Sequence, residues 1–215
     1  MKKALFLDRD GVINVDKNYV FKKSDMEFID GIFKLVRTAN FAGYMVIVVT
    51  NQSGIGRNMY TLEKFIDLSN WMKLKFLRNF SEIDDIFFCP FHPTEGVGKF
   101  KKNSFNRKPY PGMILAAKRK YNLDLKSSIM IGDNITDMEA GYSAGVGKLF
   151  FFNSSKKNVD IYENVSNLFK CIDFINKKKK KIQINYFLKS IKFILLSFVG
   201  DDFYINYFNN FDRVE

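Results

Sequence analysis

Short apolar runs alternate with longer amphipathic segments along residues 1–152. Five runs lack the apolar–polar alternation of a strand that has one face in water, and they cover residues 4–7, 44–49, 85–88, 128–131 and 148–152. Uninterrupted apolar runs of this length are typical of parallel strands that are buried on both faces. We therefore expect five strands in the interior of one sheet.

The segments between these runs carry apolar residues at helical spacing. Thr61 is placed to cap the start of one of them, and Gly43 lies where another should end. Strands that alternate with helices predict an α/β domain with a mostly parallel central sheet. The expected helices cover residues 31–43, 61–80, 111–122 and 136–145.

Composition narrows the class of protein. The chain has 215 residues, of which 47% are hydrophobic, enough for one substantial core. Its two cysteines, Cys89 and Cys171, do not suggest a disulfide framework, so we expect a cytoplasmic protein. The formal net charge of +11 favours anionic ligands, either phosphorylated metabolites or nucleic acid.

The C-terminal segment differs from the rest of the chain. Five lysines at 177–181 precede an apolar stretch at 182–200 that Lys189 and Lys192 interrupt, so we do not expect a membrane-spanning helix. The segment fits a disordered extension, the product of a reading-frame slip, or a helix on an anionic membrane or a protein partner. We divide the chain into a domain at 1–175 and a tail at 176–215, which leaves a binding or scaffold role as the non-enzymatic alternative.

Polar residues follow the first two expected strands. Asp8 ends the first in "DRDGVIN" and Asp10 lies two residues further on, and two carboxylates so close repel each other unless a cation or a proton intervenes. Thr50 begins "TNQSGIG" after the second, where a hydroxyl and glycine-rich backbone N–H groups suit a phosphate. The alternatives are an Asp-Gly turn and a glycine loop without a ligand.

Two further motifs follow later in the chain. Arg107 and Lys108 precede the helix at 111–122 and can neutralise phosphate oxygens. Asp133 ends the fourth strand, and Asp137 lies one helical turn further on. Taken alone, Arg107 and Lys108 are also consistent with a solvated basic loop, and Asp137 with an acid that the helix dipole favours. The carboxyl ends of parallel strands share one edge of a sheet, so the four motifs together predict Mg²⁺-assisted phosphoryl transfer.

The motifs "FLDRDGVIN", "VVTNQSGIGR", "RKPYPGM" and "IGDNITDMEAG" resemble those of the haloacid dehalogenase-like (HAD) phosphohydrolases. "DRDGVINVDKNYV", "FIDGI" and "TNQSGIGR" further resemble the D-glycero-D-manno-heptose 1,7-bisphosphate 7-phosphatases and related histidinol-phosphatases. The resemblance implies a Rossmannoid three-layer sandwich without a large cap domain. It also implies a Mg²⁺-dependent phosphatase that acts on a small phosphorylated sugar in the synthesis of nucleotide-activated heptose for lipopolysaccharide or capsule.

The resemblance also implies roles for individual residues. Asp8 would be the nucleophile and Asp10 the general acid and base, while Thr50 and Lys108 would bind the phosphoryl oxygens. Asp8, Asp133 and the backbone carbonyl of Asp10 would hold Mg²⁺, with Asp137 supporting the loop. The expected substrate-binding residues are Arg9, Asp16, Lys17, Asn18, Tyr19, Asn51, Gln52, Ser53, Arg107 and Asn134.

The loop at 89–108 resembles one that carries a zinc-binding pattern in the related phosphatases. The four ligand positions of that pattern fall here on Cys89, Phe91, Ser104 and Asn106. Structural zinc normally takes four cysteine or histidine ligands, so we predict that zinc is absent. His92 lies one residue beyond the ligand position. We expect the loop to be ordered by burial of the rings of Phe91, Phe100 and Phe105, or to be mobile. A histidinol-phosphatase and a polynucleotide 3′-phosphatase remain alternatives, although nucleic acid is not the favoured partner, and we expect a monomer.

Overall fold

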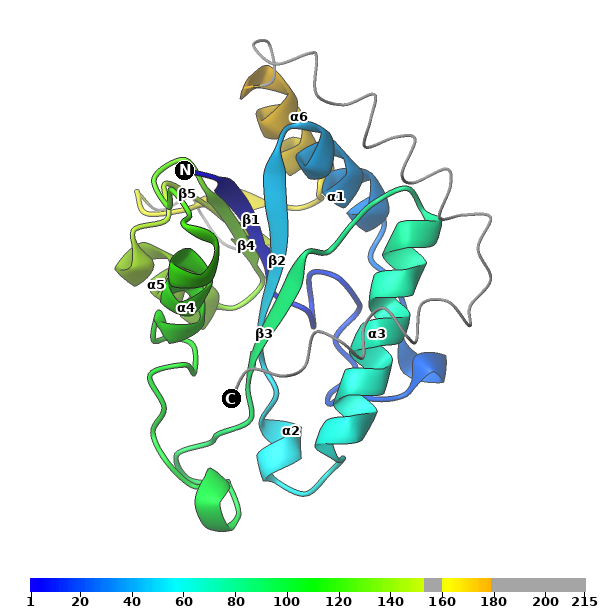
Figure 1. Cartoon of the computed structure of the whole chain (residues 1–215), viewed down its shortest axis with the longest axis vertical. Helices are drawn as coiled ribbons and strands as arrows, with labels where there is room; N and C mark the ends of the chain where they lie inside the picture. Colours follow the sequence, from blue (N-terminus) through cyan, green and yellow to red (C-terminus); the bar gives the residue numbers. More distant parts are fainter. Residues whose placement is uncertain (153–159, 179–215) are drawn as a thin grey trace. The chain divides into compact units, whose positions relative to one another are not determined.

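The computed structural model describes residues 1–152 and 160–178 (Figure 1). The expected tail at 176–215 falls outside the described residues from 179 onward, so the interpretations of that segment remain predictions. Helix α6 (Phe169–Lys178) crosses the expected division between domain and tail. None of the helices in the described ranges is long and apolar enough to cross a membrane.

A six-stranded sheet forms the centre of the domain, and each adjacent pair of strands is parallel. The order is β3-β2-β1-β4-β5-β6, so β1 lies between β2 and β4. This confirms the expected α/β class. The strands are β1 (Lys3–Leu7), β2 (Tyr44–Asn51), β3 (Asp85–Cys89), β4 (Ile129–Gly132), β5 (Lys148–Phe152) and β6 (Glu163–Val165).

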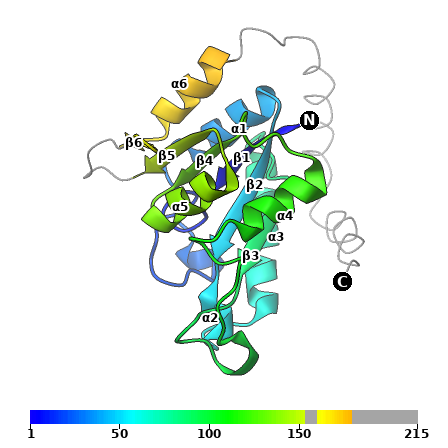
Figure 2. The ribbon, with the colours of Figure 1, turned by 90° about the vertical axis from the view of Figure 1, so that its left-hand side faces the viewer.

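Helices cover both faces of the sheet, which gives the expected three layers (Figures 1 and 2). Leu5 and Leu7 of β1 face a core shared with α1 (Ile32–Phe41), α3 (Leu62–Arg78) and α6, whereas Ala4 and Phe6 face α4 (Gly112–Tyr121) and α5 (Ile135–Ala144). Adjacent residues of a strand point to opposite faces, so a strand buried on both sides must be apolar throughout.

The loops at the carboxyl ends of β1 and β3 contain little secondary structure. Between β1 and α1 lies a single 3-10 turn, η1 (Lys23–Asp25), and β3 leads to α4 through another, η2 (Gly98–Phe100). No large cap domain occupies either connection in this described part of the chain, as expected. The pocket at this edge is therefore covered only by loops.

Local signals placed most boundaries well. Thr61 caps α3 through a hydrogen bond from the N–H of Lys64, as expected, and Gly43 follows the end of α1 with a φ of 75°. Apart from the 3-10 turns η1 and η2, three elements were not expected: β6, α6 and the four-residue helix α2 (Ser53–Gly56). α2 and β6 are too short to show a clear periodicity, so packing against the sheet decides them.

Candidate active site

A cavity of about 390 Å³ opens at the carboxyl ends of β1, β2 and β4. It brings together every predicted site residue except Arg9 and Lys17. The residues that line it span more than a hundred positions of the sequence. The lining consists of Asp8, Asp10, Asp16, Asn18, Tyr19, Thr50, Asn51, Gln52, Ser53, Tyr60, Arg107, Lys108, Asp133, Asn134, Thr136 and Asp137.

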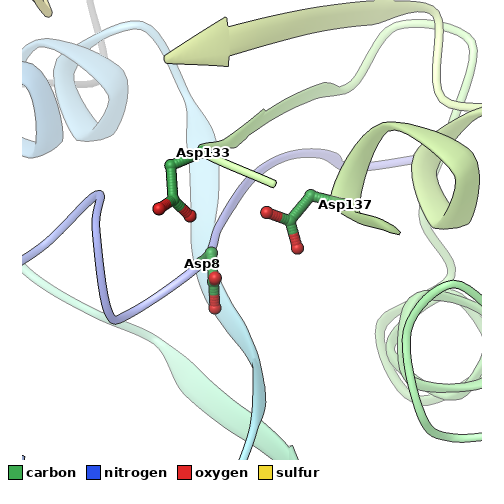
Figure 3. A group of neighbouring side chains, drawn as sticks. All are labelled: Asp8, Asp133 and Asp137. Carbon is green, nitrogen blue, oxygen red and sulfur yellow. The ribbon is translucent and has the colours of Figure 1, made fainter. Parts of the chain in front are cut away.

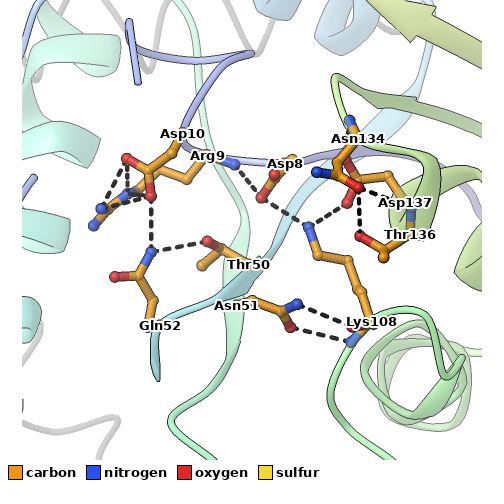
Figure 4. Close-up of polar contacts among 10 residues, drawn as sticks. All are labelled: Asp8, Arg9, Asp10, Thr50, Asn51, Gln52, Lys108, Asn134, Thr136 and Asp137. Carbon is orange, nitrogen blue, oxygen red and sulfur yellow. Dashed lines mark hydrogen bonds and ion pairs between the residues drawn. The ribbon is translucent and has the colours of Figure 1, made fainter. Parts of the chain in front are cut away.

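Lys108 lines this cavity, and its side chain ends between Asp8 and Asp137 (Figure 4). Its Nζ is 2.8 Å from Oδ1 of Asp8 and 2.6 Å from Oδ1 of Asp137. Burial alone would lower the pKa of Lys108, but the charges of Asp137 and Asp8 outweigh that effect and raise the pKa above its ordinary value. Lys108 is therefore a permanent buried cation beside the predicted nucleophile.

Asn51 fixes the backbone of Lys108. The side-chain amide of Asn51 donates to the Lys108 carbonyl at 3.1 Å, and its oxygen accepts from the Lys108 N–H at 3.0 Å. This reciprocal pair joins the end of β2 to the loop before α4. Asn51 therefore positions the lysine that reaches the nucleophile.

Asp8, Asp133 and Asp137 form a cluster of carboxylates with oxygens within 4.8 Å of one another (Figure 3). Burial, together with the charge of Asp137, raises the pKa of Asp8 to about 8 and that of Asp133 to about 7, although Lys108 acts in the opposite direction on both. Gly11, at a φ of 83°, lets the first loop approach Asp133, because a Cβ there would lie 2.0 Å from Oδ2 of Asp133. The cluster offers only oxygen ligands and needs positive charge to ionise fully near neutral pH, so it fits Mg²⁺.

Both oxygens of Asp137 already have partners. Oδ1 contacts Lys108, and Oδ2 accepts a hydrogen bond of 3.0 Å from the N–H of Asn134. The Asn134 side chain accepts in turn from the N–H of Thr136, which completes a capping box at the start of α5. These contacts support the expectation that Asp137 organises the loop.

The carboxylate of Asp10 is turned away from Lys108 and toward other donors (Figure 4). Arg9 donates to it through Nε and Nη2, and the amides of Asn14 and Gln52 donate at 3.0 and 3.1 Å. Arg9 is only 1% exposed and also donates to the carbonyl of Val20 at 2.7 Å. The structure therefore places Arg9 behind Asp10 and not at the surface of the pocket.

The first loop contributes the rim of the cavity. Asp16 accepts from the N–H of Asn18 at 2.9 Å, and both Asn18 and Tyr19 adopt positive φ values, of 56° and 61°. Lys17 lies outside the cavity lining and pairs with Glu27 at 2.8 Å on the surface. The structure thus separates Lys17 from the other predicted substrate-binding residues.

The loop between β3 and α4 is organised by aromatic contacts. The rings of Phe91 and Phe100 are partly buried and lie 5.9 Å apart, and Nζ of Lys102 lies 4.1 Å above the Phe91 ring. The expected burial of Phe105 was wrong, because its ring is 59% exposed and packs beside Tyr110 at 6.4 Å.

Residues at and beside the positions of the expected zinc pattern make contacts within the protein. Cys89 is a free, buried thiol in the core, and Nδ1 of His92 accepts from the N–H groups of Thr94 and Glu95. Nη1 of Arg107 donates to the carbonyl of Phe91 at 3.2 Å. Protein contacts thus connect the strand end to Arg107, while the absence of zinc remains a prediction.

Two lining residues were not predicted from the sequence. Tyr60 and Thr136 both face the cavity, and Tyr60 lies fifty positions from Asp10 in a turn without a recognisable motif. Thr136 lies three residues after Asp133, and the Asn134-x-x-Asp137 capping box is a sequence signal for the helix start in which it lies. Tyr60 carried no such local signal.

The architecture and site agree with a family comparison. A family model described as HAD-hydrolase-like matches residues 105–157. Among solved structures, a HAD-like protein from Mesorhizobium loti is 30% identical with a TM-score of 0.77, covering 85% of this chain and 90% of that one. The fold is that of a HAD-like hydrolase.

Curated relatives define the family more narrowly. D-glycero-α-D-manno-heptose-1,7-bisphosphate 7-phosphatase of Burkholderia mallei is 52% identical over 145 residues, which cover 67% of this chain and 77% of that protein. The enzyme of the same name from Campylobacter jejuni is 44% identical over 82% of this chain and 97% of its own length. This chain therefore belongs to the family of heptose-1,7-bisphosphate 7-phosphatases.

A solved structure shares the fold at lower identity. It is D,D-heptose 1,7-bisphosphate phosphatase from B. bronchiseptica, described as a complex with magnesium and phosphate. The TM-score is 0.72 at 24% identity, and the match covers 82% of this chain and 99% of that one. The β3–β2–β1–β4–β5–β6 domain is thus a fold known in HAD phosphatases.

Proposed function

We propose that this protein hydrolyses the 7-phosphate of D-glycero-D-manno-heptose 1,7-bisphosphate through an aspartyl-phosphate on Asp8. The observation that carries the proposal is the contact of the buried Lys108 ammonium with Asp8 at 2.8 Å, at the edge of a pocket that also holds Asp10, Thr50 and Asp133. These are the residue types that phosphoryl transfer requires, and the names of the curated relatives supply the substrate.

Asp8 is the proposed nucleophile. Its Oδ1 accepts from the N–H of Arg9 at 2.7 Å and contacts Lys108, so two donors orient the carboxylate toward the pocket. The carboxylate attacks phosphorus, and the bond between phosphorus and the leaving sugar oxygen breaks as the new bond forms. Lys108 and the hydroxyl of Thr50 hold the phosphoryl oxygens, whose charge increases in the transition state.

Asp10 is the proposed general acid and base. It gives a proton to the leaving sugar oxygen in the first step. In the second step it removes a proton from the water that attacks the aspartyl-phosphate, which releases phosphate and restores Asp8. Its position on the same loop as Asp8 suits contact with both the leaving oxygen and the incoming water.

Mg²⁺ is the proposed cofactor, held by the side chains of Asp8 and Asp133 and the backbone carbonyl of Asp10. It would offset the repulsion between an anionic nucleophile and an anionic substrate. Asp137 is engaged by Lys108 and by the N–H of Asn134, so we assign it a supporting role.

The rest of the substrate would contact the rim of the pocket. Asp16, Asn18 and Asn134 offer groups that can bind sugar hydroxyls, and Arg107 offers a cation for the second phosphate. Tyr19, Ser53 and Asn51 complete this surface. In the described residues, only loops and no large cap domain cover the pocket, which suits a small phosphorylated sugar. A cytoplasmic monomer stays our expectation.

Phosphate release with Mg²⁺ present tests the proposal. The substrates are both anomers of the heptose bisphosphate, histidinol phosphate and a 3′-phosphorylated oligonucleotide, because relatives named for the α and for the β anomer both match. We expect turnover of the heptose bisphosphate, with ³¹P NMR showing loss of the 7-phosphate only. Asp8→Asn should abolish turnover, and Asp67→Asn, at an exposed position of α3, should not.

Turnover of a different substrate in the panel would replace the heptose assignment but keep the mechanism. Near-normal turnover by Asp8→Asn would contradict the mechanism. Inactivity on every substrate would favour the binding or scaffold role.

A further inference from the structure

We propose that Tyr60 and Gln52 form a positioning pair that holds the carboxylate of Asp10 in place for proton transfer. The hydroxyl of Tyr60 donates to Oε1 of Gln52 at 2.6 Å, and Nε2 of Gln52 donates to Oδ2 of Asp10 at 3.1 Å. The chain of contacts thus runs from the turn before α3, through the end of β2, to the loop after β1. It rests on the proposed function, in which Asp10 is the acid and base.

Both members of the Tyr60–Gln52 pair are buried. Gln52 is 2% exposed and Tyr60 is 5% exposed, so water does not compete strongly for their hydrogen bonds. Burial raises the pKa of Tyr60 to about 12, and the phenol therefore stays protonated and remains a donor at any pH where the enzyme works. Gln52 was expected to bind substrate, but its amide is already engaged at both ends.

The hydrogen bonds with Tyr60 and with Asp10 together fix which way the amide of Gln52 points. With Oε1 on Tyr60, the amide nitrogen faces Asp10 and also donates to Oγ1 of Thr50 at 2.9 Å. In the reversed orientation, Oε1 would face the Asp10 carboxylate and repel it, and the amide nitrogen would face the hydroxyl of Tyr60. The observed orientation also leaves the hydroxyl hydrogen of Thr50 free to point at a phosphoryl oxygen.

Local packing keeps Tyr60 against Gln52. The ring of Tyr60 stacks on Phe21 at 5.1 Å with an angle of 15° between the rings. It also approaches the backbone of α2 so closely that a Cβ at Gly54 would lie 2.2 Å from the ring. The glycine of "TNQSGIG" therefore makes room for Tyr60, which explains this part of the motif without a ligand.

Arg9 and Asn14 also donate to Asp10, so the Tyr60–Gln52 pair is one of three anchors. Arg9 and Asn14 belong to the same loop as Asp10 and move with it. Within the described residues, Gln52, which directly follows β2, is the donor that links the Asp10 side chain to the end of the strand that carries Thr50. The pair therefore sets the position of the acid relative to the phosphate that Thr50 binds.

The test compares two leaving groups for the full-length wild type and Tyr60→Phe. A sugar oxygen needs a proton as it leaves, whereas p-nitrophenolate leaves without one, and kcat/KM reports the steps up to departure of the leaving group. We expect Tyr60→Phe to lower kcat/KM by about tenfold for the sugar phosphate and by no more than about threefold for p-nitrophenyl phosphate. Asp10→Asn should show the same selectivity with larger losses.

Tyr44→Phe is the matched control. Tyr44 is also buried, and it begins β2, at the end of the strand away from the pocket. Its hydroxyl has no hydrogen-bond partner within the described ranges. It should match the wild type on both substrates. Equal losses on the two substrates for Tyr60→Phe, or no loss on either, would overturn the proposal.

A second measurement does not depend on turnover. The two side-chain amide protons of Gln52 should give separate resonances in a ¹⁵N spectrum, and both Tyr60→Phe and Asp10→Asn should shift them, unlike Tyr44→Phe. Resonances that neither variant moves would overturn the positioning pair. An inactive wild type with shifted Gln52 resonances would instead contradict the proposed function alone.

Discussion

The ammonium group of Lys108 lies 2.6 Å from the carboxylate of Asp137, and the two side chains are 3% and 1% exposed. One end of this ion pair belongs to the loop before α4 and the other to the first turn of α5. Because Lys108 also contacts Asp8, the pair joins two loops at the nucleophile. Breaking it should affect both the fold and the reaction.

Replacing Asp137 with asparagine keeps the shape of the side chain and removes its charge. Lys108 would remain buried with one anionic partner instead of two, so we expect the free energy of unfolding to fall by about 3 kcal/mol. We also expect kcat/KM to fall by at least about tenfold, because Lys108 would lose its second contact. Urea denaturation and phosphate release measure the two effects. Asp67→Asn serves as the exposed control, and unchanged stability of Asp137→Asn would contradict this account of the ion pair.

Removing the amide of Asn51 should act on the reaction more than on the fold. Asn51→Ala deletes the two hydrogen bonds that hold the backbone of Lys108, at 3.1 and 3.0 Å. A small displacement of Lys108 misplaces the charge that binds the phosphoryl group, so we expect kcat/KM to fall by about tenfold. Steady-state kinetics beside a melting curve separate the two effects. A variant that melts like the wild type and keeps full activity would show that Lys108 is positioned by other contacts.

The two thiols should resist modification in the folded protein. Cys89 and Cys171 are both 0% exposed, and burial raises the pKa of Cys171 to about 12. A raised pKa leaves almost no thiolate at pH 8, and the thiolate is the reactive form. Ellman's reagent should therefore label neither cysteine until denaturant is added, after which it should count two. Rapid labelling of the native protein would mean that the β3 end or α6 opens readily.

Zinc should be absent from the purified protein. Only Cys89 of the four family ligand positions keeps a ligand, and its thiol lies in the core with an upward-shifted pKa caused by burial. Elemental analysis after growth in zinc-supplemented medium should find well below one zinc per chain. Treatment with EDTA followed by Mg²⁺ should restore full activity, since Mg²⁺ is the proposed metal. One tightly held zinc per chain would contradict this prediction.

Removing the contacts between Phe91 and its neighbours should loosen the loop that zinc does not hold. Phe91→Ala removes a ring that lies beside Phe100 and beneath Lys102, so Arg107, which donates to the Phe91 carbonyl, should be less well positioned. We expect KM for the bisphosphate to rise by about three- to tenfold with little change in kcat, as for lost ground-state binding. Phe105→Ala, at an exposed ring, is the control. A lowered kcat with unchanged KM would place the loop in the chemical step instead.

The amino-acid sequence by itself determined the fold class and the four motifs of the site. Apolar runs without alternation indicated buried parallel strands, and such strands must end at one edge of the sheet. Asp8, Thr50 and Asp133 directly follow or end such runs, so their convergence could be predicted from order and spacing. The basic pair before the helix at 111–122 marked Lys108 as a candidate for binding phosphate, but its role beside Asp8 came only from the resemblance.

Only the tertiary structure decided where the side chains point. The spacing of Asp8 and Asp10 is local, but Asp10 turns toward Gln52 and Tyr60 because those residues arrive from β2 and the turn before α3. From the sequence alone, Asp137 is consistent with an acid in the first turn of a helix. Its contact with Lys108 depends on the loop before α4, which brings the lysine against it. Phe105 is apolar in sequence and exposed in the structure. Local patterns report the backbone path, whereas these contacts depend on packing between segments that are distant in the chain.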